Sequence, residues 1–161
     1  MKELAISFLE ALRDGITNQI FISAGASWII ANAIKMTLYY RVHHRLNFGL
    51  LVGTGGMPSA HSALVCGMST MVAYKEGWGS SVTMVAICFT IVTMTDAAGV
   101  RRAAGRQARV LNRLADEIYQ GKGIRHERLR ELLGHTPMEV FAGGLIGFLV
   151  AAGMKAMPKL M

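Results

Sequence analysis

Long apolar stretches separated by shorter polar segments dominate the pattern of the chain. Four of these stretches, at residues 16–40, 58–74, 80–95 and 137–157, reach or approach the roughly 20 mostly apolar residues that a membrane-spanning helix needs. The second and third are short and contain several Ser, Thr and Gly residues, which suit close helix packing in lipid. The pattern therefore predicts an all-α integral membrane bundle of about four transmembrane helices, in preference to a soluble helical bundle.

Two charged segments with helical periodicity accompany the apolar stretches. Residues 1–15 combine apolar positions with Glu, Arg and Asp, so they predict an N-terminal amphipathic helix and not the apolar core of a signal peptide. Residues 105–134 place leucine and isoleucine at helical spacing on both sides of the Gly-Lys-Gly sequence at 121–123. They predict a charged helical hairpin, inserted in a single domain that spans residues 1–161.

Composition and charge decide which partners suit this basic chain. The formal net charge is +7, which fits nucleic acid or an anionic membrane surface. The chain is 52% hydrophobic and only 17% charged, whereas soluble domains carry about 25% charged residues, so we expect a bilayer and no nucleic acid as partner. Most arginines lie in the connections at residues 41–57 and 96–136, and the positive-inside rule places these connections in the cytoplasm.

The first candidate site segment is Gly-Gly-Met-Pro-Ser-Ala-His-Ser at residues 55–62. Glycines let the backbone approach a ligand closely, and the N-terminus of the following helix offers unpaired N–H groups to an anion. Ser59 adds a hydroxyl donor, and His61 in the first turn can act as an acid near neutral pH. A capped helix start explains the same residues without any ligand, and the sequence contains no Walker-type phosphate loop.

The second candidate segment is Gly-His-Thr-Pro-Met-Glu at residues 134–139. Thr136 as N-cap, Pro137 as the first helical residue and Glu139 three residues after the cap form a capping box. The Glu139 carboxylate could also hold the His135 imidazole in one tautomer and leave the other nitrogen able to attack. The pattern leaves both roles open. Two histidines, one to attack and one to protonate a leaving oxygen, suggest chemistry on a phosphate.

Further ionisable residues lie at the ends of the predicted spans on the arginine-rich side. Lys35 stands inside an apolar run, and Asp96, Arg101 and Arg102 follow the third run. Ionisable groups inside a membrane are functional candidates by default, and arginine suits bidentate phosphate contacts. Asp96 could pair with one of the arginines or hold a metal ion. The alternative interpretations are a snorkelling lysine and a positively charged cytoplasmic flank.

These motifs resemble the type 2 phosphatidic acid phosphatase and vanadium haloperoxidase superfamily, and within it the divergent small membrane branch. The superfamily pattern is K-x6-R-P, then P-S-G-H, then S-R-x5-H-x3-D. Residues 58–61 match the second part with Ala60 in place of glycine, and residues 135–139 match H-x3-D with Glu139 in place of aspartate. Strings similar to the divergent branch, Asp-Ala-Ala-Gly-Val-Arg-Arg-Ala-Ala-Gly among them, extend the likeness over nearly the whole chain.

The chain departs from the superfamily pattern in its first and third parts. Lys35 and Arg41 stand where the first part is expected, but five residues separate them and no proline follows Arg41. The arginine of the third part would be Arg101 or Arg102, although the matching histidine comes more than thirty positions later. The aspartate that ends the third apolar run has no counterpart in the pattern, so its role and that of Arg41 stay open.

The resemblance implies a mechanism and assigns roles to the candidate residues. His135 would attack phosphorus and form a phosphohistidine, Glu139 would orient His135, and His61 would protonate the leaving group. The groups that would hold the phosphoryl oxygens are Lys35, Ser59, the Ala60 backbone and Arg101 or Arg102. The resemblance requires no cofactor, although magnesium held at Asp96 would be consistent with the departure there.

The expected function is therefore hydrolysis of a lipid phosphate monoester or pyrophosphate by an integral membrane phosphatase with a cytoplasmic active site. Phosphatidylglycerol phosphate, phosphatidic acid and polyprenyl pyrophosphate are the candidate substrates. Two alternatives stay open, a non-catalytic membrane protein that binds anions in the same pocket and a vanadate-dependent oxidative enzyme. A chain with four spans could also pair with a second copy to complete a larger bundle, so a homodimer is a further expectation.

Overall fold

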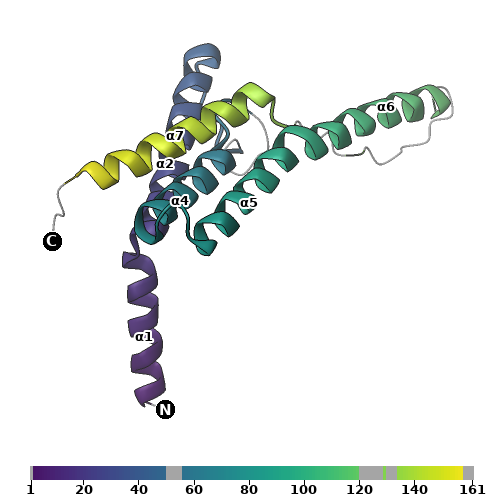
Figure 1. Cartoon of the computed structure of the whole chain (residues 1–161). Coiled ribbons are helices and arrows are strands. Elements are labelled where there is room, and N and C mark those ends of the chain that lie inside the picture. Colours follow the sequence, from purple (N-terminus) through teal and green to yellow (C-terminus); the bar gives the residue numbers. More distant parts are fainter. Residues whose placement is uncertain (1, 50–55, 120–128, 130–133, 158–161) are drawn as a thin grey trace.

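A computed structural model describes residues 2–49, 56–119, 129 and 134–157, and every regular element within these ranges is a helix. The elements are α1 (Lys2–Thr17), α2 (Gln19–His43), α4 (Ala60–Glu76), α5 (Ser81–Thr95), the π-helical segment Asp96–Val100, α6 (Arg101–Tyr119) and α7 (Pro137–Ala156). Figure 1 shows α2, α4, α5 and α7 gathered in a bundle, from which α1 and α6 extend away. The predicted all-α membrane bundle is confirmed.

Short polar residues and one glycine set the boundaries of the bundle helices. The Asn18 side chain caps α2 by accepting the Ile20 N–H at 2.9 Å, and the Ser80 hydroxyl caps α5 by accepting the Thr83 N–H at 3.2 Å. Gly77 is the C-cap that follows α4, and its φ of +89° suits a residue without a Cβ. The polar breaks between the apolar runs are therefore helix ends, as their composition predicts.

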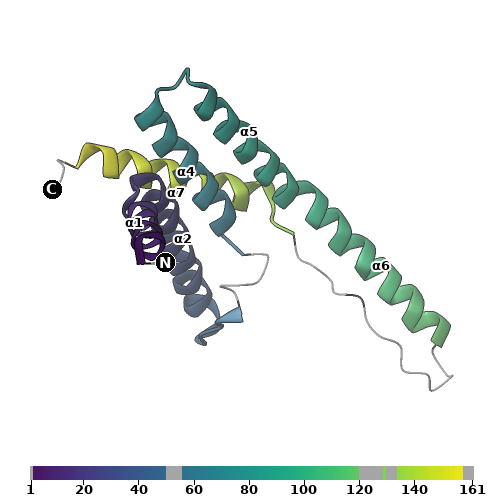
Figure 2. The ribbon, with the colours of Figure 1, turned by 90° about the horizontal axis from the view of Figure 1, so that it is seen from below.

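Helix α4 lies at the centre of the bundle and contacts α2, α5 and α7 (Figures 1 and 2). Its contact with α7 is so close that a Cβ at Gly143 would collide with the Ser59 carbonyl, and one at Gly147 would collide with the Ala63 carbonyl. Both contacts advance four residues along each helix, so α4 and α7 run parallel. The N-termini of the two helices therefore lie at the same end of the bundle.

Buried hydroxyl groups connect α4 to its other two neighbours. The Ser23 hydroxyl of α2 donates to the Gly67 carbonyl at 3.0 Å. The Thr90 hydroxyl of α5 lies 3.2 Å from the Val65 carbonyl and 3.1 Å from the Ser69 hydroxyl. Small and hydroxyl-bearing residues are typical of helix interfaces in lipid, where apolar burial alone gives little preference for one helix neighbour over another.

Large apolar side chains cover the outside of the bundle, as a bilayer requires. More than half of the side-chain surface is exposed at Phe21, Ile29, Val85, Val92 and Phe141. The chain is therefore a membrane protein with its apolar surface turned towards lipid.

The number of predicted spans is not confirmed. Within the described residues, three helical stretches are long and apolar enough to cross a membrane, Gln19–His43, Ser81–Ile118 and Pro137–Ala156. The second predicted span, residues 58–74, corresponds to α4, which has only 17 residues and buries ten of them. A helix of this length lies at the lower limit for a membrane span, and most of its residues are buried among neighbouring helices.

Helices α5 and α6 follow one another along a single long rod (Figures 1 and 2). The 38 residues Ser81–Ile118 would extend for about 57 Å at 1.5 Å per residue, nearly twice the thickness of about 30 Å of the hydrocarbon core. The α6 end therefore projects beyond the bundle as a charged arm. It supplies the first helix of the predicted hairpin, while residues 120–128 and 130–133 lie outside the described residues.

Candidate functional site

The N-termini of α4 and α7 meet at one end of the bundle and are joined through their backbones. The Ser59 N–H donates to the Glu139 carbonyl at 2.9 Å, directly beside the close contact between Gly143 and the Ser59 carbonyl. A cis peptide bond between Met57 and Pro58 leads the chain into this junction. The two motifs that the sequence singles out, residues 58–61 and 135–139, are thus side by side.

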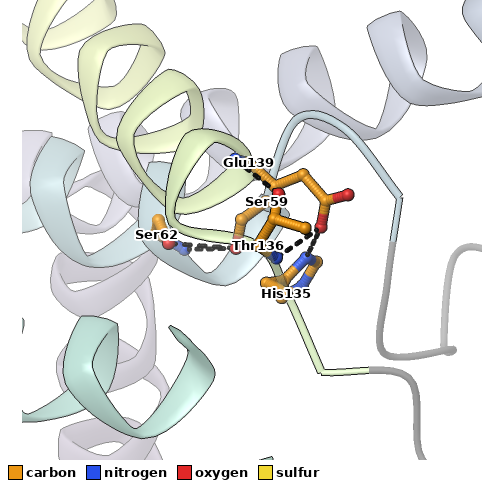
Figure 3. A network of polar contacts seen from close by, with 5 residues as sticks. All are labelled: Ser59, Ser62, His135, Thr136 and Glu139. Carbon is orange, nitrogen blue, oxygen red and sulfur yellow. Dashed lines mark hydrogen bonds and ion pairs between the residues drawn. The ribbon is translucent and has the colours of Figure 1, made fainter. Parts of the chain in front are cut away.

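Ser59 is the N-cap of α4 and is fully buried. Its hydroxyl oxygen accepts the Ser62 N–H at 3.3 Å and the Ser62 hydroxyl at 3.0 Å, as Figure 3 shows. Ala60 follows as the first residue of the helix, and the first N–H groups of a helix have no partner within it. The helix start therefore presents the Ala60 N–H as a backbone donor, while the Ser59 hydroxyl holds the cap in place.

A single carboxylate oxygen of Glu139 serves both roles that the sequence left open (Figure 3). Glu139 Oε2 accepts the Thr136 N–H at 3.1 Å and lies 3.0 Å from His135 Nδ1, while the Glu139 N–H donates to the Thr136 hydroxyl at 3.3 Å. An ionised carboxylate can only accept hydrogen bonds, so the proton of this hydrogen bond is on His135 Nδ1. His135 Nε2 then keeps its lone pair, which is the form of imidazole that can attack an electrophile.

His135 is held by its backbone as well as by its ring. It is only 3% exposed, and its N–H donates to the carbonyl of Ala97 at 3.2 Å. The preceding residue, Gly134, lies against the backbone of Arg102, where a Cβ would collide. Ala97 belongs to the π-helical segment, an element that is frequent at functional sites. The junction between α5 and α6 therefore fixes the position of the histidine.

Lys35 adds a cation to the same region from α2. Its side chain is buried, with 4% exposure, and its aliphatic part lies against Gly56, where a Cβ would stand 3.5 Å from Cδ. The ammonium interacts electrostatically with the Glu139 carboxylate. Three separated segments of the chain thus bring a lysine, a histidine–glutamate pair and a helix N-terminus together.

The remaining predicted site residues whose side chains are described are more exposed than His135 and Lys35. Arg41, in the last turn of α2, is exposed, and so is the side chain of Arg102. His61 occupies the first turn of α4 and is exposed, whereas Asp96 begins the π-helical segment and is partly buried. The side chain of Arg101 lies outside the described part of the chain, so the choice between Arg101 and Arg102 stays open.

Metal ligation was a further expectation for Asp96. Among the residues that the structure describes, no three His, Cys, Asp or Glu side chains gather in a group that could hold a metal ion. Magnesium at Asp96 therefore stays a prediction without a ligand cluster to support it.

The backbone contacts that place His135 were not predicted from the sequence. The four-residue spacing of Gly143 and Gly147 was the available signal for the α4–α7 contact, since small residues at this spacing mark close helix pairs in membranes. No local pattern indicates the second unpredicted feature, a pair of hydrogen bonds at 2.9 Å that join the Asn112 amide to the N–H and carbonyl of Leu129. This pair holds Leu129 against α6.

Comparisons with known proteins agree with this architecture. The sequence pattern of the divergent PAP2 family matches residues 16–150. The chain is also 42% identical over 146 residues to the protein described as "Uncharacterized membrane protein YuiD" of Bacillus subtilis (strain 168), and the match covers 84% of this chain and 92% of the Bacillus protein. No solved structure matches the chain. The match over most of its length shows that the chain belongs to the divergent PAP2 family.

Proposed function

We propose that this protein is an integral membrane phosphatase that hydrolyses a lipid phosphate monoester or pyrophosphate through a phosphohistidine intermediate. The observation that carries the proposal is the buried His135, whose Nδ1 lies 3.0 Å from the Glu139 carboxylate. This pair stands at the junction of two helix N-termini and beside the Lys35 ammonium. Membership of the divergent PAP2 family supports the same reaction class.

The reaction proceeds in two balanced steps. His135 Nε2 attacks phosphorus, the bond between phosphorus and the leaving oxygen breaks, and His61 donates a proton to that oxygen. Water then attacks the phosphohistidine, gives a proton to His61 and releases inorganic phosphate. Glu139 stabilises the imidazolium that develops as the Nε2–P bond forms, because its carboxylate stays within hydrogen-bond distance of Nδ1.

The phosphoryl group needs positive charge and hydrogen-bond donors that are already in place. Lys35 supplies the charge, and the first N–H groups of α4 supply donors at the positive end of a helix dipole. Such preorganised groups provide a large part of the rate enhancement in phosphoryl transfer, because they stabilise charge without reorganising. The arginine at position 101 or 102 is the further candidate for the developing charge.

The substrate of this proposal is a lipid, because the site lies at the end of a helix bundle whose outer surface is apolar. Phosphatidylglycerol phosphate, phosphatidic acid and polyprenyl pyrophosphate all present a phosphate at the membrane surface. The distribution of arginines supports a site on the cytoplasmic side, where phospholipid synthesis would provide the substrate.

The direct test is phosphate release by the purified protein in lipid nanodiscs, measured on these three substrates with magnesium and with a chelator. His135→Ala should reduce kcat by more than about 10³-fold, and His61→Ala by about 10²–10⁴-fold. His43→Ala, an exposed histidine at the end of α2, is the matched control and should leave kcat unchanged. Acid quenching during turnover should trap a labelled phosphoenzyme in the wild type and none in His135→Ala.

Other outcomes of the same experiment would overturn the proposal. Vanadate binding by the folded protein without phosphate release would indicate a non-catalytic anion-binding protein. Peroxide-dependent oxidation in the presence of vanadate would indicate the oxidative reaction class. Equal phosphate release by wild type and His135→Ala would remove His135 as the nucleophile.

A further inference from the structure

An apolar groove of about 490 Å³ runs between α2 and α4. Phe21, Gly25 and Trp28 line it from α2, and Leu64 and Met68 line it from α4. Its far end reaches the junction of α1 and α2. The volume lies within the range of about 300–1,000 Å³ of pockets that bind small organic ligands.

The spacing of the lining residues directs this groove towards the proposed phosphatase site. On α2, residues 21, 25 and 28 share one helix face, and continuing that face leads to Asn32 and Lys35. On α4, His61 precedes Leu64 and Met68 on a common face. Lys35 follows Trp28 by seven positions along α2, a rise of about 10 Å.

Contacts of Trp28 connect the groove to the start of α4. Trp28 packs against the buried cluster of Ala31, Ala60 and Ala63, and Ala60 is the first residue of α4. The inner end of the groove therefore lies beside the helix N-terminus to which the phosphate is assigned.

Asn32 marks the change from apolar to polar surroundings between the groove and Lys35. It is 3% exposed, and its Nδ2 donates to the Trp28 carbonyl at 3.1 Å. Its Oδ1 is buried and accepts no hydrogen bond from the described residues. An unsatisfied buried acceptor is unfavourable, so a hydroxyl of a bound ligand that donates to Asn32 Oδ1 at this level would be stabilised.

We propose that the groove binds one long hydrocarbon chain of the lipid phosphate, with the phosphate at Lys35 and the start of α4. The position of the lipid's phosphate in this inference rests on the proposed function, and the position of its hydrocarbon chain rests on the groove. From Trp28 back to Asn18, the groove follows α2 for about 15 Å, which is half of the hydrocarbon thickness of about 30 Å. A chain lying along it would therefore stay at the depth of its own leaflet.

The first test fills the groove and compares substrates with and without a chain. Gly25 lines the groove, and a Cβ there meets nothing within 4 Å, so Gly25→Leu occupies the groove without a backbone collision. It should lower kcat/KM by about tenfold or more for oleoyl lysophosphatidic acid, mainly through KM. Hydrolysis of glycerol phosphate should stay unchanged, and geranylgeranyl phosphate distinguishes an isoprenoid chain from an acyl chain.

Gly153→Leu is the matched control, because a Cβ at Gly153 also meets nothing within 4 Å and the residue lies on α7, outside the groove. It should leave all three substrates unaffected. Equal losses in the two leucine variants, or an equal loss on glycerol phosphate, would overturn the assignment of the groove.

A second test detects binding without turnover and separates the two proposals. The chain has two tryptophans, and Trp78→Phe leaves Trp28 as the single fluorophore while keeping an aromatic ring near Tyr74. In nanodiscs, a brominated lysophosphatidic acid should quench Trp28 more than an equal fraction of brominated lysophosphatidylcholine, and Lys35→Met should remove the difference. Equal quenching by both lipids would overturn the groove proposal. Selective quenching without phosphate release would uphold it and reject the phosphatase.

Discussion

The α4–α7 interface and the charged arm, which is α6 together with Leu129 and Gly134 that lie against it, hold the surroundings of His135 by different physical means. At the interface, backbones are in direct contact through Gly143 and Gly147, and no side chain could be inserted between them. In the arm, two hydrogen bonds at 2.9 Å hold Leu129 to Asn112 on a mostly exposed helix. Steric contact tolerates almost no displacement, whereas a few hydrogen bonds near water can open and close again.

The difference indicates that the interface and the arm position different parts of the site. The interface fixes the helix starts that carry the backbone donors and Glu139, and these groups must keep their geometry throughout the reaction. The arm determines only where the chain enters α7, through Gly134 and the bond from His135 to Ala97. Changes at the interface should therefore affect folding first, and changes in the arm should affect the reaction first.

The largest effect is expected where the two backbones touch. Gly143→Leu forces a side chain against the Ser59 carbonyl. It should lower the free energy of unfolding by about 1–3 kcal/mol or more, and it should abolish phosphate release. Thermal unfolding in nanodiscs measures the loss. Gly153→Leu, on the same helix with nothing near its Cβ, should unfold like the wild type. Equal Tm values for the two variants would contradict the close α4–α7 contact.

The next effect separates catalysis from stability. Gly134→Ala places a methyl group against the Arg102 backbone and displaces His135 from the Ala97 carbonyl. A misplacement of about 1 Å costs about 10²-fold in rate, so kcat should fall by that order while Tm changes far less than in Gly143→Leu. Gly99→Ala, with nothing within 4 Å of its Cβ, is the control. A Gly134→Ala variant with normal kcat would show that the arm does not position His135.

A smaller effect is expected at Glu139, which belongs to both regions. Glu139→Gln keeps an oxygen for the Thr136 N–H, since glutamine also completes a capping box, but it removes the charge beside His135. Charged hydrogen bonds exceed neutral ones by about 1 kcal/mol, so kcat should fall by about tenfold with little change in Tm. Glu139→Ala should also lose about 1 kcal/mol of stability. A Gln variant that unfolds as early as the Ala variant would reduce Glu139 to a helix cap.

The sequence predicts only part of this difference between the rigid interface and the adjustable arm, and particular residues show why. Apolar runs and caps predict most of the helices, because both depend on neighbours in the chain. The capping box and the H-x3-E spacing predict the contact between His135 and Glu139 for the same reason. The Ala97 carbonyl, the Asn112 amide and the Gly134–Arg102 contact depend on how distant segments meet, and no local pattern records that. The central place of α4 depends on its packing against α2, α5 and α7, which hydropathy alone does not reveal.

The smallest effect is expected in the arm itself. Asn112→Ala removes both hydrogen bonds to Leu129, each worth about 1 kcal/mol, from a site that is far from the α4–α7 contact. The Leu129 amide should exchange its hydrogen faster, kcat should fall by less than about tenfold, and Tm should stay near the wild-type value. Asn112→Asp keeps the oxygen that accepts the Leu129 N–H and loses the Nδ2 donor, so its exchange rate should lie between those of Asn112→Ala and the wild type. If Asn112→Ala lowered Tm as far as Gly143→Leu does, the arm would be part of the folding core, and the division between a rigid interface and an adjustable arm would fail.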